Sequence, residues 1–164
     1  PPRHIRWMIR RDMPEVLDIE RRSFEFPWTE DDFVWCLRRR NCIGLVADAY
    51  PSSTEHSRVL GFVLYELGKH HVEILNVAVH PEERLIGVGA ALVDKLLGKL
   101  KPGRRTDLIV HVRESNLGAQ KFFRQKGLLA TGVVRGLYDD TPEDAYCFKA
   151  QVDALHPGEL VCPF

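Results

Sequence analysis

The sequence predicts a single α/β domain in which a mixed, mostly antiparallel sheet is flanked by about four helices. Its 164 residues, 45% of them hydrophobic, are enough to enclose one proper core. Three segments rich in Val, Ile and Leu follow one another at residues 42–50, 59–67 and 72–79, with turn-like stretches between them. After residue 89, helical and strand-like patterns alternate. A run of strands followed by β-α-β-α-β order is typical of a mixed sheet with helices on its faces.

The N-terminal elements are predicted from signals that start and stop helices. Ile5–Arg10 is expected to form a short first strand. Asp12 is placed to cap the following helix, with Pro14 in its first turn. Pro27 ends this region, because the residue before a proline avoids the helical conformation, and Thr29 can cap a second helix. The expected apolar faces consist of Val16, Leu17, Ile19 and Phe24 in the first helix and Phe33 and Leu37 in the second.

The C-terminal half is predicted in the same way. A helix after Gly89 has leucine and valine at helical spacing and ends at Pro102. Asp107–Val112 is the next expected strand, Asn116 caps another helix, and Gly127 ends that helix. The domain should span residues 1–152, followed by an extended or poorly ordered tail at residues 153–164. Its closing strands are expected at Leu128–Val134 and Tyr146–Val152.

Composition and charge argue against several classes of function. Lys plus Arg and Asp plus Glu each number 23, so the net charge is zero, whereas nucleic-acid binders carry a basic surplus. The four cysteines form no C-x-x-C pair and no metal spacing with histidine, which favours reduced, mostly buried thiols and a cytoplasmic setting without a metal site. No apolar run reaches membrane-spanning length, so a membrane partner is not expected.

The most informative segment for function reads NVAVHPEERLIGVGAAL. Gly87 and Gly89 lie where a helix begins, and the free N–H groups and dipole of a helix N-terminus attract phosphate. A Walker loop would need a lysine at Ala90, and the dinucleotide fingerprint would need a glycine at Leu92. Two interpretations are left: a plain strand-to-helix turn, and the acyl-CoA pattern Q/R-x-x-G-x-G/A, which begins here at Arg84.

Together with three further segments, this loop resembles the GNAT superfamily of N-acetyltransferases over roughly residues 5–152. Residues 22–33 resemble the N-terminal segment of the RimI-like branch, whose members acetylate the α-amine of a ribosomal protein. Residues 73–81 resemble the central fourth strand of the superfamily, and residues 112–127 its fifth strand and the next helix. The resemblance implies acetyl-CoA as co-substrate and direct transfer of its acetyl group to an amine.

The resemblance also implies which residues would hold acetyl-CoA. The backbone of Val77 and Val79 would bind the pantetheine arm, and the N–H of Val77 would polarise the thioester carbonyl. A plain core strand is compatible with this role, because only the backbone is used. The side chain of Asn116 would also bind the pantetheine arm. The pyrophosphate would be held by Arg84, Gly87, Val88, Gly89 and Ala90.

Two departures from the RimI-like pattern concern catalysis. His111 stands where these enzymes place a glutamate, and Phe123 stands where they place a tyrosine general acid. Glu73 is the leading candidate base, because a glutamate acts at the matching place in the histone acetyltransferase branch; the alternative is a solvated strand residue. His111 is the second candidate base, and the alternative is that it is a hydrogen-bonded histidine of the sheet with no catalytic role. Tyr138 is expected to line the acceptor cleft or to replace the missing acid. The alternative is that Tyr138 is an exposed tyrosine in a turn.

The chemistry favours an α-amine as acceptor. An α-amine is about one-tenth neutral at pH 7, a penalty of about 1.4 kcal/mol, whereas a lysine faces about 4.6 kcal/mol. The leading acceptor is a protein or peptide N-terminus, as the RimI-like features imply. The alternatives are a small-molecule or antibiotic amine, or a non-catalytic acyl-CoA-binding module. The protein is expected to act as a monomer or homodimer.

Overall fold

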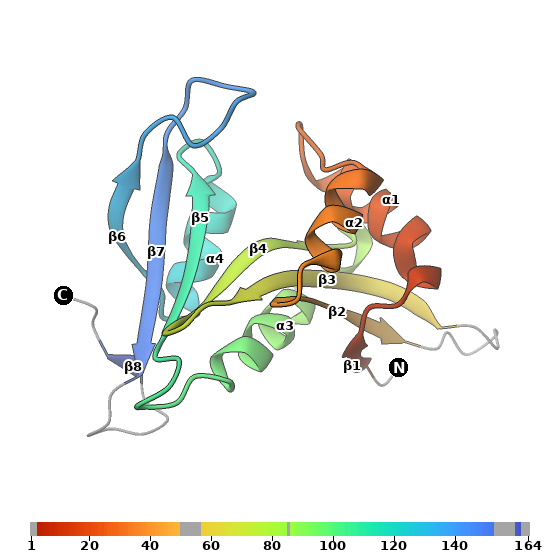
Figure 1. Cartoon of the computed structure of the whole chain (residues 1–164). Coiled ribbons are helices and arrows are strands. Elements are labelled where there is room, and N and C mark those ends of the chain that lie inside the picture. The colour runs from red at the N-terminus through yellow and green to blue at the C-terminus, as the bar shows by residue number, and fades with distance from the viewer. Residues whose placement is uncertain (1–2, 50–56, 85, 153–159, 162–164) are drawn as a thin grey trace. The chain divides into compact units, whose positions relative to one another are not determined.

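The computed structural model describes residues 3–49, 57–84, 86–152 and 160–161. The expected α/β class with a mixed sheet is confirmed. The chain divides into two compact units, Pro1–Glu66 with Asn76–Asp94 and Leu67–Leu75 with Lys95–Phe164. The described strands are β1 (Arg3–Trp7), β2 (Cys42–Ala49), β3 (Arg58–Leu67), β4 (His71–Val79), β5 (Asp107–Arg113), β6 (Leu129–Val134), β7 (Ala145–Val152) and β8 (Leu160–Val161) (Figure 1). Their order in the sheet is β1-β2-β3-β4-β5-β7-β6, and β8 pairs with β7.

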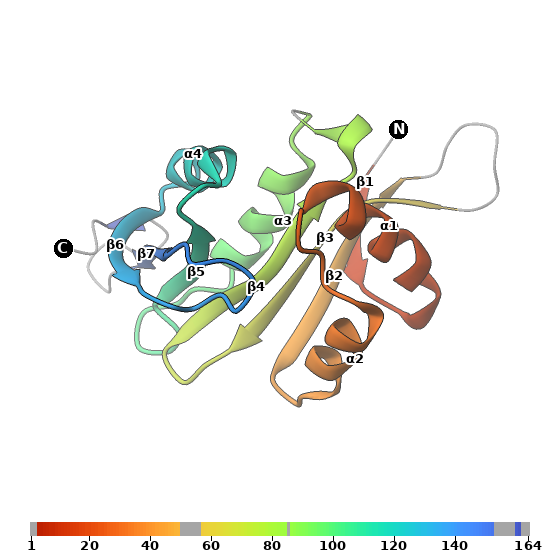
Figure 2. The same cartoon turned by 90° about the horizontal axis from the view of Figure 1, so that it is seen from above.

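The first unit contains β1, β2, β3 and the second half of β4. β1 pairs antiparallel with β2, and β2 pairs antiparallel with β3, as the succession of apolar segments predicts. Helices α1 (Met13–Ser23) and α2 (Glu30–Arg38) cover one face of these strands, and the first turns of α3 (Val88–Leu97) lie on the other face (Figure 2). Fully buried side chains fill the space between helices and strands: Val16, Ile19, Phe33, Val46 and Phe62.

A close approach at Gly61 of β3 brings the end of β4 and the start of α3 together. A Cβ atom at Gly61 would lie 2.9 Å from the backbone oxygen of Ala78 and 3.1 Å from Cγ1 of Val88. The first distance is shorter than real Cβ contacts, so a side chain here would push these elements apart. The glycine thus allows the strand and the helix that flank residues 80–87 to pack tightly.

The N-terminus differs from the sequence prediction. The first strand ends at Trp7 instead of Arg10, because the carboxylate of Asp12 accepts hydrogen bonds from the N–H of Ile9 at 2.8 Å and from Arg6 at 2.8 Å, and these bonds turn the chain. Asp12 makes no side-chain cap bond to α1, so its expected role as that helix's cap is wrong. Thr29 does cap α2, since its side chain accepts from the N–H of Asp32.

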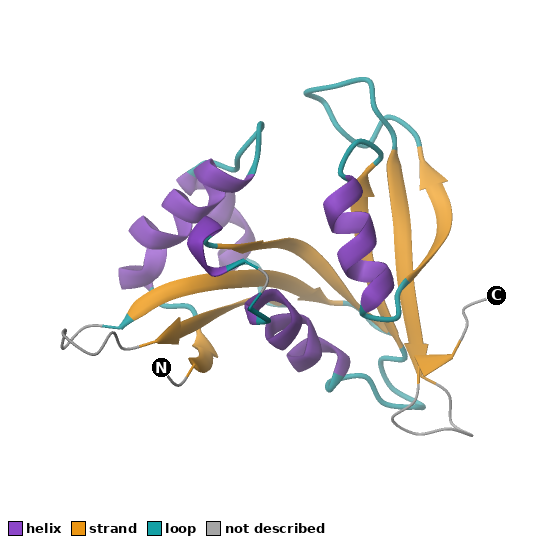
Figure 3. Ribbon diagram, turned by 180° about the vertical axis from the view of Figure 1, so that it is seen from behind, coloured by secondary structure: helices purple, strands orange, loops and turns teal. Residues whose placement is uncertain are grey.

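The second unit contains the first half of β4 with β5, β6, β7 and β8. β5 runs parallel to β4 and antiparallel to β7, which also pairs antiparallel with β6. Helix α4 (Leu117–Gln125) lies against one face of these strands (Figure 3). Alternate side chains of β5 are buried on the core side (Leu108, Val110 and Val112), and the residues between them are half-buried.

The remaining differences lie at element ends. Helix α3 begins at Val88, one residue before Gly89, and ends at Leu97, well before Pro102. A short 3-10 helix at Pro81–Glu83, which the sequence did not predict, connects β4 to the glycine loop. Within the segment expected as a tail, Leu160–Val161 form β8. Residue 50 of the expected strand and tail residues 153–159 and 162–164 lie outside the described residues.

Candidate active site

The residues expected to hold the pyrophosphate lie around the N-terminus of α3. Gly87 has a φ of +87°, a conformation that side chains other than glycine rarely adopt, and its carbonyl accepts the first helical bond from Ala91 at 3.0 Å. The N–H groups of the first helical turn, at Val88, Gly89 and Ala90, have no acceptor inside the helix. The loop thus presents backbone donors and the positive end of a helix dipole, which fits a pyrophosphate.

Arg84, expected to help hold the pyrophosphate, makes two hydrogen bonds to other parts of the first unit. Its Nε donates to the carbonyl of Val79 at 3.2 Å, and its Nη2 donates to Oγ of Ser23 at 3.0 Å. The side chain therefore ties the loop to the ends of β4 and α1. The phosphate donors that the geometry offers directly are the backbone N–H groups of α3.

Arg3 lies beside the same loop, which the sequence analysis did not anticipate. Its Nη1 donates to the carbonyl of Ile86 at 2.8 Å, and the same atom lies 3.7 Å from where a Cβ of Gly87 would be. This contact joins residues 83 positions apart in the chain, so no local motif could reveal it. Arg3 adds a second guanidinium to the surroundings of the glycine loop.

Val77 and Val79, expected to bind the pantetheine arm, lie in the last part of β4. Both are half-buried, whereas Asn76 before them and Ala78 between them are buried. Strand alternation therefore directs the valines to one face of β4 and the other two residues to the opposite face. The carbonyl of Val79 accepts from Arg84, as described above.

In the second unit, the two candidate bases are in direct contact. Nδ1 of His111 on β5 lies 3.3 Å from Oε1 of Glu73 on β4, with the two side chains 28% and 26% exposed. The parallel pairing of β4 and β5 places the two side chains on the same face. The sequence presented Glu73 and His111 as competing candidates; the structure joins them in one pair, in which a carboxylate can orient the imidazole and stabilise its protonated form.

Asn116 forms the predicted cap of α4. Its Oδ1 accepts from the N–H of Ala119 at 3.0 Å. This bond fixes the side chain at the start of the helix and uses its acceptor oxygen. The amide nitrogen of the same side chain is the group that would donate to the pantetheine arm.

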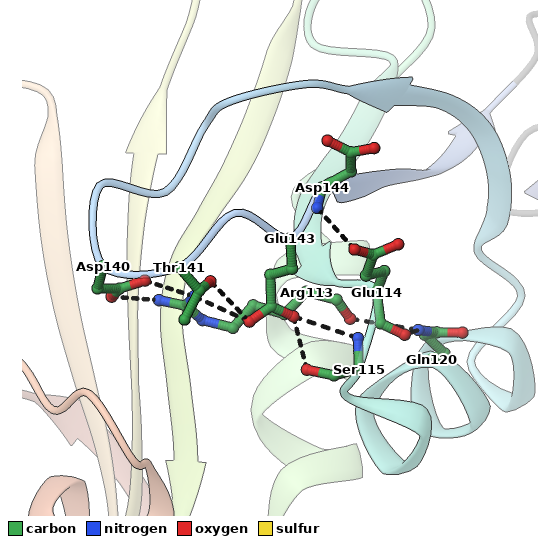
Figure 4. A network of polar contacts seen from close by, with 8 residues as sticks. All are labelled: Arg113, Glu114, Ser115, Gln120, Asp140, Thr141, Glu143 and Asp144. Carbon is green, nitrogen blue, oxygen red and sulfur yellow. Dashed lines mark hydrogen bonds and ion pairs between the residues drawn. The ribbon is translucent and has the colours of Figure 1, made fainter.

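Tyr138 lies in the loop between β6 and β7 and is held by Arg113 at the end of β5. The guanidinium carbon of Arg113 lies 3.8 Å from the centre of the Tyr138 ring. The same guanidinium binds Asp140 with two bonds of 2.7 Å and Glu143 at 3.3 Å (Figure 4). Burial raises the pKa of Tyr138, an effect that the charge of Arg113 opposes. Tyr138 is thus a restrained, half-buried residue and not an exposed turn tyrosine.

Further bonds connect this loop to the turn between β5 and α4. Oε1 of Glu143 accepts from Oγ of Ser115 at 2.6 Å, and Oε1 of Glu114 accepts from the N–H of Asp144 at 3.0 Å (Figure 4). Nε2 of Gln120 donates to the carbonyl of Glu114 at 2.9 Å. Arg113 and its acidic partners therefore order the loop that carries Tyr138, a role that no short motif indicated.

Phe123, at the position of the usual tyrosine acid, is a core residue of α4. Its side chain is 3% exposed, and its ring packs edge-on against Phe122 with a centroid distance of 5.0 Å. The residue provides no proton donor. Any acid assistance to the leaving thiol must come from another group.

Comparison with known proteins defines the family. The model of the acetyltransferase (GNAT) family matches residues 5–128, more than half of the chain. The chain therefore belongs to the acetyltransferase (GNAT) family. Membership of this family makes it an enzyme, an N-acetyltransferase that takes its acetyl group from acetyl-CoA.

Individual relatives agree with this assignment. The ribosomal protein bS18-alanine N-acetyltransferase of Escherichia coli (strain K12) is 26% identical over 136 residues, which cover 82% of this chain and 87% of that protein. A crystal structure of the Escherichia coli enzyme has a TM-score of 0.75 at 22% identity, covering 99% of this chain and 97% of the other. Arabidopsis thaliana NAA60 in complex with acetyl-CoA has a TM-score of 0.81 at 17% identity, covering 92% and 99%.

The described part of the chain contains neither a membrane-spanning helix nor a metal-binding cluster. None of its helices combines the length and the apolar character that crossing a membrane requires. Its described His, Cys, Asp and Glu side chains include no group of three or more arranged to hold a metal ion.

Proposed function

We propose that this acetyltransferase acts on the α-amine at the N-terminus of a protein, by direct attack on the thioester in a ternary complex. The observation that carries the proposal is the pair formed by Glu73 and His111, whose side chains lie 3.3 Å apart and remain about a quarter exposed. A carboxylate–imidazole pair can take a proton from an attacking amine, and an α-amine with a pKa near 8 needs less help from a base than a lysine does. The name of the Escherichia coli relative, an alanine N-acetyltransferase of a ribosomal protein, supports this acceptor class.

The proposed reaction moves one acetyl group and one proton. The amine nitrogen forms a bond to the acetyl carbon, the carbon–sulfur bond breaks, and its electron pair leaves on the sulfur as thiolate. The amine proton passes to Nε2 of His111, either directly or through water. Glu73 faces Nδ1 and favours the tautomer in which Nε2 can accept a proton. We assign polarisation of the thioester carbonyl to the N–H of Val77.

The absence of a tyrosine at Phe123 is compatible with turnover. A thiol with a pKa comparable to cysteine, about 8.5, leaves as thiolate without a dedicated acid. Tyr138 is a weak substitute donor, because burial raises its pKa and its ring is stacked on Arg113. We therefore assign Tyr138 to contact with the acceptor and not to proton donation.

The proposal is tested by isosteric changes in the pair, assayed with a peptide that has a free α-amine. His111→Gln and Glu73→Gln should each lower kcat by about 10²-fold, a typical contribution of general base catalysis, and flatten the pH–rate profile near neutrality. The double variant should be little slower than His111→Gln alone, because residues that act as a unit are not additive. Asp107→Asn is the matched control, since Asp107 lies on β5 like His111, pairs with Lys149 of β7 at 3.6 Å and has no assigned role.

Three results would contradict the proposal. One is an unchanged pH–rate profile in both single variants while Asp107→Asn behaves identically to them. The second is efficient acetylation of small-molecule amines with no turnover of any peptide, which would favour the antibiotic-type acceptor. The third is binding of acetyl-CoA without turnover of any amine, which would favour a non-catalytic module.

A further inference from the structure

A buried acid in the first unit has no role in the reaction as described above. Glu20 of α1 is 1% exposed and follows Met13 and Val16 at helical spacing, so it occupies a position where the pattern calls for an apolar residue. Burying a carboxyl group costs free energy unless hydrogen bonds compensate. An aliphatic side chain at this position would serve the core at lower cost, so the acid requires another explanation.

The contacts of Glu20 lead to two segments with functional assignments. Nδ2 of Asn76 donates to both carboxylate oxygens, at 2.9 and 2.7 Å. The backbone N–H of Trp28 also donates to the carboxylate. Asn76 lies in β4, and Trp28 lies in the connection between α1 and α2, so one carboxylate joins the helix, the strand and the connection.

Asn76 is the residue whose peptide unit carries the N–H of Val77. The six atoms of a peptide unit are coplanar, so the orientation of that N–H is fixed by the backbone of Asn76. The Asn76 side chain is 9% exposed and points away from the face of Val77. Anchoring it on Glu20 restrains rotation of the peptide plane from the face of β4 opposite to Val77.

The charge state of Glu20 depends on these bonds. Burial raises its pKa to about 7, while the bonds from Asn76 and Trp28 lower it and the charge of Asp32 raises it. Near neutral pH, the carboxylate is therefore balanced between ionised and neutral forms. Both forms can accept hydrogen bonds, but only the ionised form has two equal acceptor oxygens.

We propose that Glu20 is a positioning residue for acetyl transfer: through Asn76 it orients the Val77 N–H, and through Trp28 it holds the connection between α1 and α2. This inference rests on the proposed function, because it takes the Val77 N–H as the group that polarises the thioester. Hydrogen-bond donors of this kind must be preorganised to be effective. Because Glu20 is 1% exposed, it acts through its neighbours.

Isosteric substitutions separate this role from simple packing. In Glu20→Gln the carboxylate becomes an amide with one acceptor oxygen, so an NH2 donor replaces one of the two oxygens that accept from Asn76. In Asn76→Asp the donor is lost and two carboxyl groups face each other. In the double variant Glu20→Gln/Asn76→Asp, the new amide can donate to the new carboxylate and accept from Trp28, so every bond of the cluster is restored with donor and acceptor exchanged.

The expected result is a change in kcat at nearly constant affinity for acetyl-CoA. Glu20→Gln should lower kcat about tenfold, less than the 10²–10³-fold loss on removing an oxyanion donor outright, because the N–H is displaced and not deleted. KM for acetyl-CoA should change by less than about twofold. Asn76→Asp should be slower still, and the double variant should recover most of the parent kcat.

Asp12→Asn provides the matched control. Asp12 is a buried carboxyl group directly before α1, 4% exposed and paired with Arg6 at 2.8 Å. It lies roughly 12 Å from Glu20 along the helix, at 1.5 Å per residue. This variant should lower the melting temperature and leave kcat within about twofold of the parent, which shows that lost stability alone does not slow the reaction.

The outcomes distinguish this inference from the function on which it rests. An active parent with an unaffected Glu20→Gln, or a folded double variant no faster than the slower single variant, would overturn the positioning role alone. A parent that transfers no acetyl group to any amine would overturn the proposed function and this inference with it. If Glu20→Gln does not fold, Asn76→Asp is compared with the double variant. A higher kcat in the double variant supports the inference, and an equal or lower kcat contradicts it.

Discussion

At the scale of single residues, the account depends on groups placed where ordinary packing would not put them. Glu20 is buried where an aliphatic residue would pack, and Gly87 has a backbone conformation that side chains rarely adopt. Both lie next to elements assigned to acetyl-CoA, namely the last residues of β4 and the first turn of α3. Each therefore gives a prediction that is measured without an activity assay: the pH dependence of stability for Glu20, and the affinity for acetyl-CoA for Gly87.

The first prediction concerns the pH dependence of stability. Because the pKa of Glu20 is raised from 4.5 to about 7 in the folded protein, the stabilisation from its bound proton is complete below about pH 4.5 and is lost as the pH rises through about 7. Between pH 5 and pH 8 the parent should therefore lose of the order of 1–3 kcal/mol of unfolding free energy relative to Glu20→Gln. Urea unfolding of both proteins at the two pH values measures this difference.

Asp12→Asn is again the control for this measurement. Burial would raise the pKa of Asp12, but the hydrogen bonds from Arg6 and Ile9 and the charges of Arg6 and Arg11 together outweigh it, and the pKa is lowered. The stabilisation from the ionised Asp12 carboxylate is therefore lost only as the pH falls toward that lowered pKa. Asp12→Asn should accordingly change the free energy of unfolding equally at pH 5 and pH 8. A constant difference between the parent and Glu20→Gln across the same range would contradict the assignment of a raised pKa to Glu20.

The second prediction concerns the glycine loop. Gly87→Ala should cost about 1 kcal/mol of stability, because alanine is strained at positive φ, and should weaken binding of acetyl-CoA by distorting the N-terminus of α3. Gly103→Ala is the matched control, since Gly103 has a φ of +77° and open space around it. Calorimetric titration with acetyl-CoA should show weakened binding for the first variant only. Equal binding by both variants would mean that the cradle is assigned to the wrong loop.

At the scale of elements, the loop between β6 and β7 is ordered by one arginine at the end of β5. Arg113 stacks on Tyr138 and pairs with Asp140 and Glu143, so a single side chain holds several parts of the loop. Lysine cannot reproduce both the flat stacking surface and the two parallel bonds to a carboxylate. The loop should therefore depend on arginine at this position and not merely on a positive charge.

The third prediction follows from that difference. Arg113→Lys should raise KM for the peptide acceptor about tenfold and leave KM for acetyl-CoA nearly unchanged, because the assigned acetyl-CoA contacts in the first unit are not altered. Arg39→Lys is the control, since Arg39 also stacks on an aromatic ring, Trp35, at 4.5 Å and pairs with Glu66 at 2.9 Å. Steady-state kinetics in each substrate would contradict the account if the two variants raised the peptide KM equally.

At the scale of the whole molecule, local chemistry was predictable from the sequence and long-range pairing was not. The caps at Thr29 and Asn116 were predicted because a cap and its N–H donor lie within three residues. The apolar strands were found because burial imposes a pattern on consecutive residues. The site residues of the glycine loop came from spacing and resemblance together, and the structure places them at the start of α3 as expected.

The parts that the sequence could not supply depend on how distant segments meet. The pairing of Glu73 with His111 requires the parallel alignment of β4 with β5, which no local pattern specifies. The same holds for Arg113, whose partner Asp140 is 27 residues away. Asp12 was assigned to the wrong partner for a related reason: a cap signal says which side chain can accept a bond, but Arg6 and Ile9 compete for the same carboxylate.

The central claim is that the enzyme transfers the acetyl group of acetyl-CoA to an N-terminal α-amine, and the most direct test is the position of the acetyl group in the product. A peptide with a free N-terminus and an internal lysine is incubated with the protein and acetyl-CoA, and tandem mass spectrometry locates the added mass. The same peptide with a blocked N-terminus serves as the control. The account predicts acetylation of the α-amine only and no reaction of the blocked peptide. Acetylation of the lysine side chain in both peptides would contradict it.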